Sequence, residues 1–375
     1  MESNDRLLDI IDTKALTAIT GSIDISFGEI ASIYPDELEI KPVYQRLFRW
    51  TETQQSQFIE SLILELPIPQ IFVIETESRK YELIDGLQRI SSFLHFMGIL
   101  DKGRYEEGDK LVLQNCDIVK ELNGLTFDNL SPALRIKVKR SYVRMQIIKK
   151  ESPKRLKYDM FKRLNTGGSL LSAQEIRNST IRLLDEDFID FIQSLKNNSD
   201  FKECISYIMD EQINEQFDDE LVLRFFTLKN ANLSKSQGTL ADFMTQYAEN
   251  IADKVEGFDF EKEKECFEKT FKLLNAILPN GAIFVHYSKR GFQKQFLSFH
   301  YEAFSIGVSK FLDKIPPDNS DLVRKLMTKF AKLKDNPRFQ EITKNEKEKR
   351  TSGSKYLKYL DERINSVESA IKEIL

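Results

Sequence analysis

The residues of this chain whose types and spacing best suit chemistry lie in the string ELIDGLQRISSFL, residues 82–94. Its apolar start predicts a strand, Asp85 and Gly86 predict a turn, and a helix is expected to begin within about three residues. The unpaired backbone N–H groups and the dipole of such a helix start favour phosphate, and Arg89 adds a bidentate donor. Taken alone, the string is better explained as a structural turn with a solvated arginine.

Two further strings change that balance. KPVYQRLFRW, residues 41–50, places two arginines among aromatic side chains. This mixture suits the joint binding of a planar base and a phosphate, although a loop anchored by its aromatics would contain the same residues. FKRLNTGGSLLSAQEIRN, residues 161–178, is a polar connection with two glycines between two predicted helices. It is also compatible with an ordinary helix–turn–helix connection whose helices have standard caps.

Local patterns predict the elements that would position these strings. Residues 51–66 begin with a capping box and continue with apolar residues at helical spacing until two prolines end the helix. Residues 70–75 and 80–84 are apolar, β-branched runs that predict a β-hairpin. The helix that follows is expected to end at Gly98.

The second part of the chain has a different character. Residues 141–150 predict a strand, and the next two helices begin after Pro153 and at a capping box of Ser172 with Glu175. From residue 186 onwards the chain shows amphipathic helices with few strand signals. We therefore predict an α+β fold, with an α+β domain at 1–185, an all-α domain at 186–375 and a soft boundary near 185–200.

Charge is distributed in blocks along the 375 residues, although the formal net charge is only −4. Residues 135–163 contain twelve basic and two acidic residues, and residues 324–350 contain ten basic and four acidic ones. Residues 1–40 and 185–220 are acidic. The basic blocks are either solvated helix faces that pair with the acidic ones, or candidate contacts for DNA phosphates.

The expected compartment is a reducing cytoplasm. The three cysteines are scattered, the N-terminus is acidic and carries no apolar signal region, and the apolar runs are too short to span a bilayer. Secretion and membrane insertion are therefore not expected.

The strings YQRLFRW, IPQIFVIE, YELIDGLQR and FKRLNTGGSLLSAQEIRN, in this order, resemble one family closely. They look like the N-terminal domain of the GmrSD-type modification-dependent restriction endonucleases, over roughly residues 25–185. This resemblance implies a ParB/sulfiredoxin-like domain that binds, and in several members hydrolyses, a nucleoside triphosphate. It also implies a role in bacterial defence against phage.

The resemblance carries site residues onto this chain. It implies nucleotide binding by Tyr44, Gln45, Arg46, Trp50, Gly86, Gln88, Asn165, Gly167 and Arg177, and catalytic roles for Asp85, Arg89 and Glu175. One position departs from the family, since Leu87 stands where a glutamine is usual, and this bears more on hydrolysis than on binding. Which nucleoside triphosphate is preferred stays open.

The chemistry of these residues suggests their roles. Arg89, Gly86 and the helix N-terminus would hold the β- and γ-phosphates, with Arg46 as a second clamp on developing charge. Asp85 would orient a water or a hydrated Mg²⁺, and Glu175 is the alternative for that duty. The chain has no GxxxxGK[ST] string, so a P-loop enzyme is not expected.

Longer members of the family continue into an HNH-type nuclease domain, which needs clustered histidines. This chain has only His95, His286 and His300, and each is better explained by a core or surface role than by metal ligation. A complete nuclease on these residues is not expected, so DNA cleavage would require a partner effector protein.

The chain is thus interpreted as a sensor or regulator of a restriction-type system that binds and hydrolyses a nucleoside triphosphate. It is expected to act on or with DNA and a partner effector, either as a single copy or as a homo-oligomer. The competing hypothesis is a non-enzymatic DNA-binding or scaffold module whose motifs only maintain the fold. Sulfiredoxin-like redox chemistry ranks last, because no cysteine lies near Gly86 in the sequence.

Overall fold

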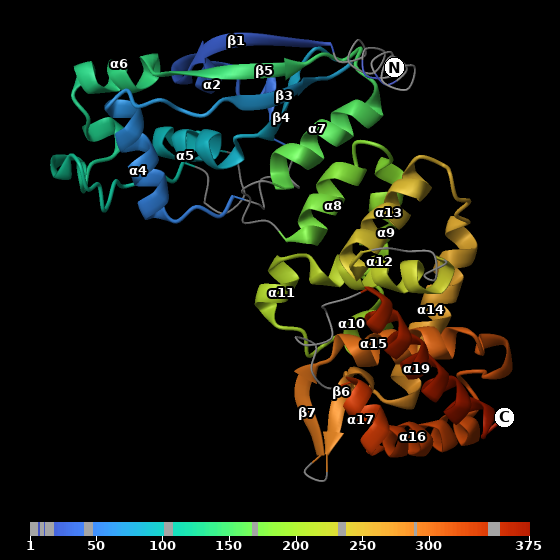
Figure 1. Cartoon of the computed structure of the whole chain (residues 1–375). Helices are drawn as coiled ribbons and strands as arrows, with labels where there is room; N and C mark the ends of the chain where they lie inside the picture. Colours follow the sequence, from blue (N-terminus) through green and yellow to red (C-terminus); the bar gives the residue numbers. More distant parts are fainter. Residues whose placement is uncertain are drawn as a thin grey trace. The chain divides into compact units, whose positions relative to one another are not determined.

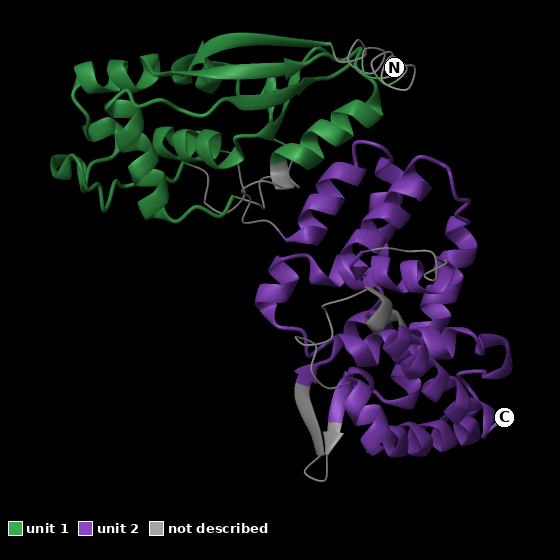
Figure 2. Cartoon of the chain, in the orientation of Figure 1, with its two compact units in different colours: residues 1–171 green, residues 172–375 purple. Residues whose placement is uncertain are grey.

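The structure is a computed structural model of the whole chain (Figure 1). It describes residues 7, 11, 19–40, 48–100, 108–166, 172–231, 238–288, 291–343 and 353–375. The chain divides into two compact units, residues 1–171 and residues 172–375 (Figure 2). This division precedes the boundary expected near 185–200, so the helix that begins after Ser172 belongs to the second unit.

The first unit is built on a five-stranded mixed sheet in the order β1-β5-β3-β4-β2. The strands are β1 Thr20–Ser26, β2 Leu38–Glu39, β3 Ile71–Glu75, β4 Tyr81–Asp85 and β5 Tyr142–Ile148. Neighbours β1/β5 and β3/β4 are antiparallel, whereas β3/β5 and β2/β4 are parallel. Strand β1 is therefore one edge of the sheet, and the β3–β4 hairpin lies inside it.

Helices and short 3-10 turns complete the first unit. They are α2 Phe27–Ile33, α4 Glu52–Ile63, α5 Leu87–Met97, η1 Lys120–Leu122, η2 Phe127–Asn129, α6 Pro132–Arg140 and α7 Lys154–Thr166. The ring of Phe27 lies 5.9 Å from that of Phe58 on α4 and 5.0 Å from that of Phe93 on α5. These three helices thus share an aromatic core, in which edge and tilted ring contacts are favourable.

Most local predictions for this unit are confirmed. The capping box of Thr51 and Gln54, the β3–β4 hairpin and strand β5 are all present. Gly98 ends α5 with a left-handed φ of 73°. One prediction was too long: α4 ends at Ile63, because the chain turns at Glu65 with a φ of 56° and leaves Leu66 exposed.

The second unit is helical, with one small hairpin. Its elements are α8 Ala173–Ile181, α9 Glu186–Leu195, α10 Ser199–Cys204, α11 Asp210–Asn214, α12 Phe217–Asn230, α13 Leu240–Ala252, α14 Phe260–Ile277, η4 Ala282–Phe284, β6 Val285–Ser288, β7 Gly291–Phe296, α15 Ser298–Ser309, η5 Leu312–Lys314, α16 Ser320–Lys334, α17 Pro337–Thr343 and α19 Gly353–Lys372. The sequence predicted helices only, and the antiparallel β6–β7 pair departs from that prediction. Two runs of at most six residues carry too little periodicity to be recognised as strands.

Phenylalanines fill the core of this unit. The rings of Phe267 and Phe271, one helical turn apart on α14, lie 4.4 Å from each other and contact Phe201 and Phe225. Part of the 27 phenylalanines of the chain is thus used in this core. The combination of a mixed-sheet unit and a helical unit confirms the predicted α+β class.

Candidate functional site

The predicted strand–turn–helix of residues 82–94 is present as the junction of β4 with α5 (Figure 1). Gly86 is the N-cap of α5, and its φ of 100° is strained for any residue with a side chain. A Cβ at this position would also overlap Cγ2 of Ile71, which lies on β3. Glycine is thus required here by backbone conformation and by close packing, whether or not a ligand approaches.

The N-cap residue of α5, Gly86, supplies no capping side chain. Most helices whose N-caps the structure describes have a Ser, Thr, Asp or Asn whose oxygen accepts a first-turn N–H, as Thr51 does for α4. Gly86 offers no such oxygen, so the positive end of the α5 dipole lacks the usual local acceptor. An 11-residue helix that begins in this way favours an anion near its first turn.

The Arg89 guanidinium lies beside this turn and is held by three acceptors. Its Nη2 donates to Oδ2 of Asp85 at 3.0 Å, and its Nη1 donates to the carbonyl oxygens of Pro69 and of Gln70, the latter at 3.1 Å. Burial lowers the pKa of Arg89, and the Asp85 carboxylate opposes that effect. The side chain is only 14% exposed, so the ion pair is mostly screened from water.

Arg89 therefore has a structural role that the sequence did not indicate. Its hydrogen bonds connect the segment before β3 to the end of β4. A guanidinium carries five N–H groups, so these three bonds leave Nε–H and one Nη2–H without a partner in the described part of the chain. The second carboxylate oxygen of Asp85 is likewise available to a ligand, since only Oδ2 accepts the hydrogen bond from Arg89.

Gln88 joins the first two sequence strings. Its Oε1 accepts the backbone N–H groups of Arg49 and Trp50, each at 3.0 Å. The carbonyl oxygen of Trp50 in turn accepts Nε2 of Gln55 at 3.0 Å, and the Trp50 ring lies 5.8 Å from that of Phe58. The structure thus brings Trp50 to the β4–α5 turn and places Gln88 as the tether between them.

Gln55 is a positioning residue that the sequence reasoning missed. It is fully buried on α4, where its Oε1 lies 2.8 Å from Nδ1 of His95 on α5. His95 is 2% exposed and so occupies the core position expected for it. A polar residue among the inward positions of an amphipathic helix was the signal that could have identified Gln55.

Several predicted site residues lie outside the described residues. Tyr44, Gln45, Arg46 and Gly167 belong to this group, as does the side chain of Asn165, whose backbone lies in α7.

Glu175 and Arg177 lie on α8 in the second unit. Glu175 is the third residue of the predicted capping box, where its carboxylate accepts the N–H of Ser172 at 2.7 Å. Arg177 donates to Oε1 of Gln174 at 2.6 Å and pairs with Glu220 on α12 at 3.4 Å. Burial lowers the pKa of Arg177. Both side chains are buried and form bonds within their own unit.

The Arg177–Glu220 pair continues into a buried chain of charges. Glu220 also pairs with Arg224 at 2.6 Å, and Glu302 accepts from Arg224 at 3.1 Å and from Arg363 at 2.8 Å. Alternating charges of this kind compensate one another in a low-dielectric interior, and losing one member would leave its neighbour unpaired. In the structure these ion pairs join α8, α12, α15 and α19.

The first basic block is partly neutralised. Lys137, Arg144, Lys149, Lys150 and Arg155 each lie within ion-pair distance of a carboxylate. The two nitrogens of Arg144 donate to both oxygens of Asp24, its cross-strand neighbour on β1, at 2.9 and 3.0 Å. Part of the block therefore stabilises the sheet.

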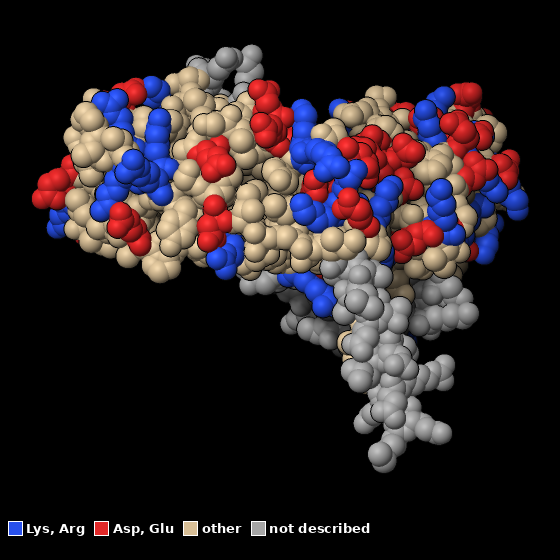
Figure 3. Space-filling model, turned by 90° about the horizontal axis from the view of Figure 1, so that it is seen from above, with Lys and Arg blue, Asp and Glu red and all other residues tan. Residues whose placement is uncertain are grey.

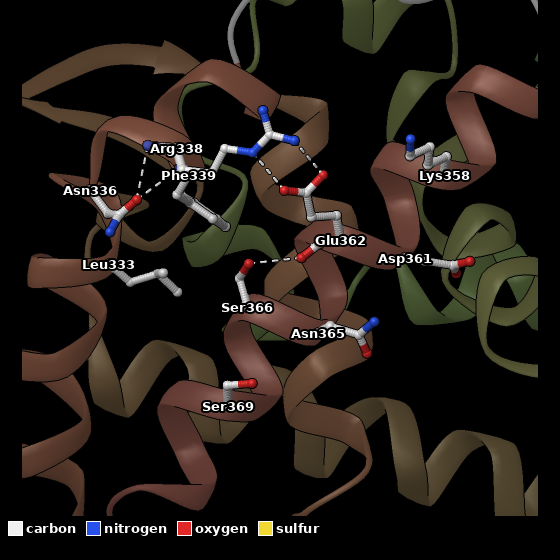
Figure 4. A pocket seen from close by; sticks show the side chains of 10 residues that line it. All are labelled: Leu333, Asn336, Arg338, Phe339, Lys358, Asp361, Glu362, Asn365, Ser366 and Ser369. Carbon is white, nitrogen blue, oxygen red and sulfur yellow. Dashed lines mark hydrogen bonds and ion pairs between the residues drawn. The ribbon is translucent and has the colours of Figure 1, made fainter.

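In the second basic block, several of the cations that the structure describes, within 324–343, are engaged by the fold. Arg338 donates from Nε and Nη2 to the two oxygens of Glu362 at 2.6 and 2.8 Å, across a pocket of about 650 Å³ (Figure 4). Lys334 is fully buried, and its ammonium donates to the carbonyl oxygens of Ala282, Ile283 and Val285. Lys334 is thus unable to reach a phosphate outside the fold.

The thiols are poorly suited to nucleophilic chemistry. Burial raises the pKa of Cys116 to about 11 and raises the pKa of Cys204 still further. A reactive cysteine needs the opposite shift. Among the described residues, no group of three or more His, Cys, Asp or Glu side chains is arranged to hold a metal ion.

Comparison with known proteins identifies the first unit. Residues 30–182 match the family model described as the GmrSD restriction endonuclease, N-terminal domain. These residues are therefore similar to this family, and the resemblance predicted from the four strings is confirmed. No curated protein and no solved structure matches the chain, so the ParB/sulfiredoxin-like fold stays a prediction. No helix in the described part of the chain is long and apolar enough to cross a membrane.

Proposed function

We propose that this chain, whose residues 30–182 are similar to the N-terminal domain of the GmrSD restriction endonuclease family, binds a nucleoside triphosphate at the β4–α5 turn. In this proposal it acts as the sensor or regulator of a restriction-type system that defends bacteria against phage. Hydrolysis of the nucleotide would supply the switch between two states of the regulator.

The observation that carries the proposal is the combination of an uncapped helix start with a fixed guanidinium. Gly86 brings no capping oxygen to the first turn of α5, and Arg89 is held beside this turn with two N–H groups that have no partner in the described part of the chain. Backbone N–H groups and a preorganised arginine together favour the charge of a phosphate chain. Trp50, which Gln88 holds near this turn, supplies an aromatic surface for a base.

Mg²⁺ fits this arrangement through Asp85. One oxygen of its carboxylate faces Arg89, and the other is available to a hydrated ion that also binds the phosphates. Glu175, the alternative predicted from the sequence, is fully buried and accepts a helix-capping N–H in the second unit. Asp85 is therefore the carboxylate that we assign to the metal.

DNA and an effector nuclease are the proposed partners. Cations at 135–163 that keep an exposed ammonium or guanidinium would contact DNA phosphates, and the block at 324–350 would contribute only through its exposed members. Such binding should weaken steeply with salt, and charge reversal at Lys149, Lys150, Lys154 and Arg155 should weaken it further. Cleavage itself would be performed by the partner.

The test uses the only tryptophan of the chain, Trp50, as a reporter. Each of the four common nucleoside triphosphates is added with Mg²⁺, and tryptophan emission, thermal stability and phosphate release are measured. We expect at least one nucleotide to stabilise the protein, since a ligand at a hundred times its Kd adds about 2.7 kcal/mol. The proposal fails if the wild-type protein shows neither stabilisation nor phosphate release.

Two variants separate binding from folding. Arg89→Lys keeps the positive charge but loses the forked donor, and should weaken nucleotide binding while the protein remains folded. Arg79→Ala removes a 75% exposed arginine from the neighbouring hairpin and serves as the control. Asp85→Asn should retain nucleotide binding and lose Mg²⁺-dependent phosphate release.

The alternative function, a DNA-binding or scaffold module without catalysis, is favoured by one observation. Every bond of Arg89 described above, and the contact of Gly86 with Ile71, would be needed for the fold alone. Under this alternative the Arg89 variants lose stability, and no nucleotide changes the emission of Trp50.

A further inference from the structure

The first unit contains a groove that none of the three sequence strings involves. It has a volume of about 1000 Å³ and lies between the segment after α4, helix α6 and the start of β5. Leu66 and Ile136 line it and are 44% and 50% exposed, and Tyr142 lines it and is 67% exposed. Large apolar and aromatic side chains that gather around one groove mark a binding surface rather than an ordinary patch of surface.

The charges around the groove favour an anionic ligand. Three cations line it, Lys137, Arg140 and Arg144, against two carboxylates, those of Asp24 and Glu65. The carboxylates are each paired with a cation, Asp24 with Arg144 and Glu65 with Lys137 at 3.7 Å. Figure 3 shows Lys and Arg side chains gathered over the end of the first unit that carries α6 in Figure 1.

Arg140 is the cation that remains for a ligand. It is exposed at the last residue of α6 and makes no hydrogen bond or ion pair within the described part of the chain. Tyr142 follows two residues later as the first residue of β5, and the alternation of the strand turns Val143 to the buried side. An exposed aromatic ring thus lies beside an unpaired guanidinium and an apolar wall.

We infer that this groove binds a single-stranded segment of nucleic acid. Tyr142 stacks on a base, Leu66 and Ile136 cover the apolar surface of that base, and Arg140 binds the adjacent phosphate. Binding of single strands without strong sequence preference commonly combines an aromatic stacking surface with a positively charged groove. A duplex keeps its bases stacked inside, so Tyr142 would contribute little to its binding.

The groove also adjoins the proposed nucleotide site. Gln70 lines the groove, and its carbonyl oxygen accepts a hydrogen bond from Arg89. A strand that occupies the groove therefore contacts the same short segment that positions the Arg89 guanidinium. The inference rests on the nucleic-acid part of the proposed function and is independent of nucleotide hydrolysis.

The experiment measures the anisotropy of a fluorescein-labelled thymidine oligonucleotide, single-stranded or paired with its complement, at several salt concentrations. We expect Tyr142→Ala to weaken single-strand binding by about 5- to 150-fold, the effect of losing one stacked base. Tyr142→Phe should bind within about twofold of the wild type because its ring still stacks. Urea unfolding midpoints establish that each variant is folded.

A matched pair of charge variants tests the position of the site. Arg140 and Lys139 are neighbours in the last turn of α6, but Lys139 does not line the groove and lies over the ring of Phe127 at 5.7 Å. Arg140→Ala should weaken single-strand binding more than Lys139→Ala. Equal effects of the two, with no effect of Tyr142→Ala, would overturn the groove as the site while leaving general DNA binding intact.

One further outcome would refute both the groove inference and the proposed binding of nucleic acid. If neither the single strand nor the duplex binds at low salt, the groove inference and the nucleic-acid part of the proposed function fail together. The nucleotide part is then still decided by tryptophan emission and phosphate release, which require no oligonucleotide.

Discussion

Replacing Gln88 tests whether one side chain holds Trp50 at the proposed nucleotide site. In Gln88→Ala the N–H groups of Arg49 and Trp50 lose their shared acceptor. At about 1 kcal/mol net for each hydrogen bond, the tethered position of this segment loses about 2 kcal/mol, or roughly a thirtyfold shift in its equilibrium. The bond from Gln55 and the contact with Phe58 remain, so the change should be local.

Gln88→Glu separates positioning from ligand binding. Its carboxylate accepts the same two N–H groups, with charge-assisted bonds, so the Trp50 segment stays in place. The new negative charge repels phosphate by about 3 kcal/mol at a separation of about 6 Å and an effective dielectric constant of about 20. Screening by salt reduces this repulsion, and we expect nucleotide binding to weaken by about tenfold or more.

The assay is the emission spectrum and acrylamide quenching of the single tryptophan, with and without nucleotide. Gln88→Ala should shift the emission to longer wavelength and increase quenching, whereas Gln88→Glu should resemble the wild type until nucleotide is added. Gln57→Ala, an exposed glutamine on the same α4 helix as Gln55, is the control. An unchanged spectrum in Gln88→Ala would refute the tether, and wild-type affinity in Gln88→Glu would refute the position assigned to the phosphates.

Three further predictions concern stability and reactivity. Gly86→Ala should lower the free energy of unfolding by about 2–4 kcal/mol in urea titrations, because the new side chain is strained by the positive φ and overpacks against its neighbours. Gly124 has a φ of 86° but open space around it, so Gly124→Ala should lower the free energy of unfolding only by the conformational part. Equal losses of stability in the two variants would contradict the packing argument. The pKa of about 11 leaves about one Cys116 thiol in a thousand as thiolate at pH 8 in the folded protein. In a variant that keeps Cys116 as its only cysteine, a disulfide reagent should therefore react at least a hundredfold faster with the unfolded than with the folded protein. Burial lowers the pKa of His300 well below its usual value. The stability that this group contributes is complete above its unfolded pKa of about 6.5 and should be lost as the pH falls below it, by up to about 1.4 kcal/mol per pH unit. His300→Gln should flatten that dependence between pH 7.5 and 5, and an unchanged slope would count against the assignment.

The elements that the sequence predicted correctly are those whose signals are local. The capping box at Thr51, the hairpin at 70–85 and the glycine that ends α5 each depend on residues within a few positions of one another. Strand β1 was missed because its stability depends on pairing with β5, more than a hundred residues away, in a register that places Asp24 opposite Arg144. Such pairings leave little trace in a short, mostly exposed segment.

The candidate site shows the same limit at the level of side chains. The sequence identified the turn at Asp85–Arg89, but the partners of Arg89 are carbonyl oxygens from a segment about twenty residues earlier. Gln88 was predicted to bind a ligand, and the structure gives it a tether that reaches back 38 residues to Trp50. Residue types at a given spacing indicate which chemical groups a site contains. Long-range hydrogen bonds determine how many of those groups are already bound within the fold and how many remain for a ligand.

Charge counting along the chain has a corresponding limit, because a block of basic residues does not reveal which of its members are paired. Within 135–163, Arg144 and Lys149 bind carboxylates that come from β1 and β3, far away in the sequence. Their charges hold the sheet together and are only partly available to a polyanion. Arg140 lies on the same block without a carboxylate partner in the described part of the chain, and it borders an apolar groove. The nucleic-acid binding that we propose would therefore depend on a few positions around α6, and the total charge of the block overstates the affinity that it could supply.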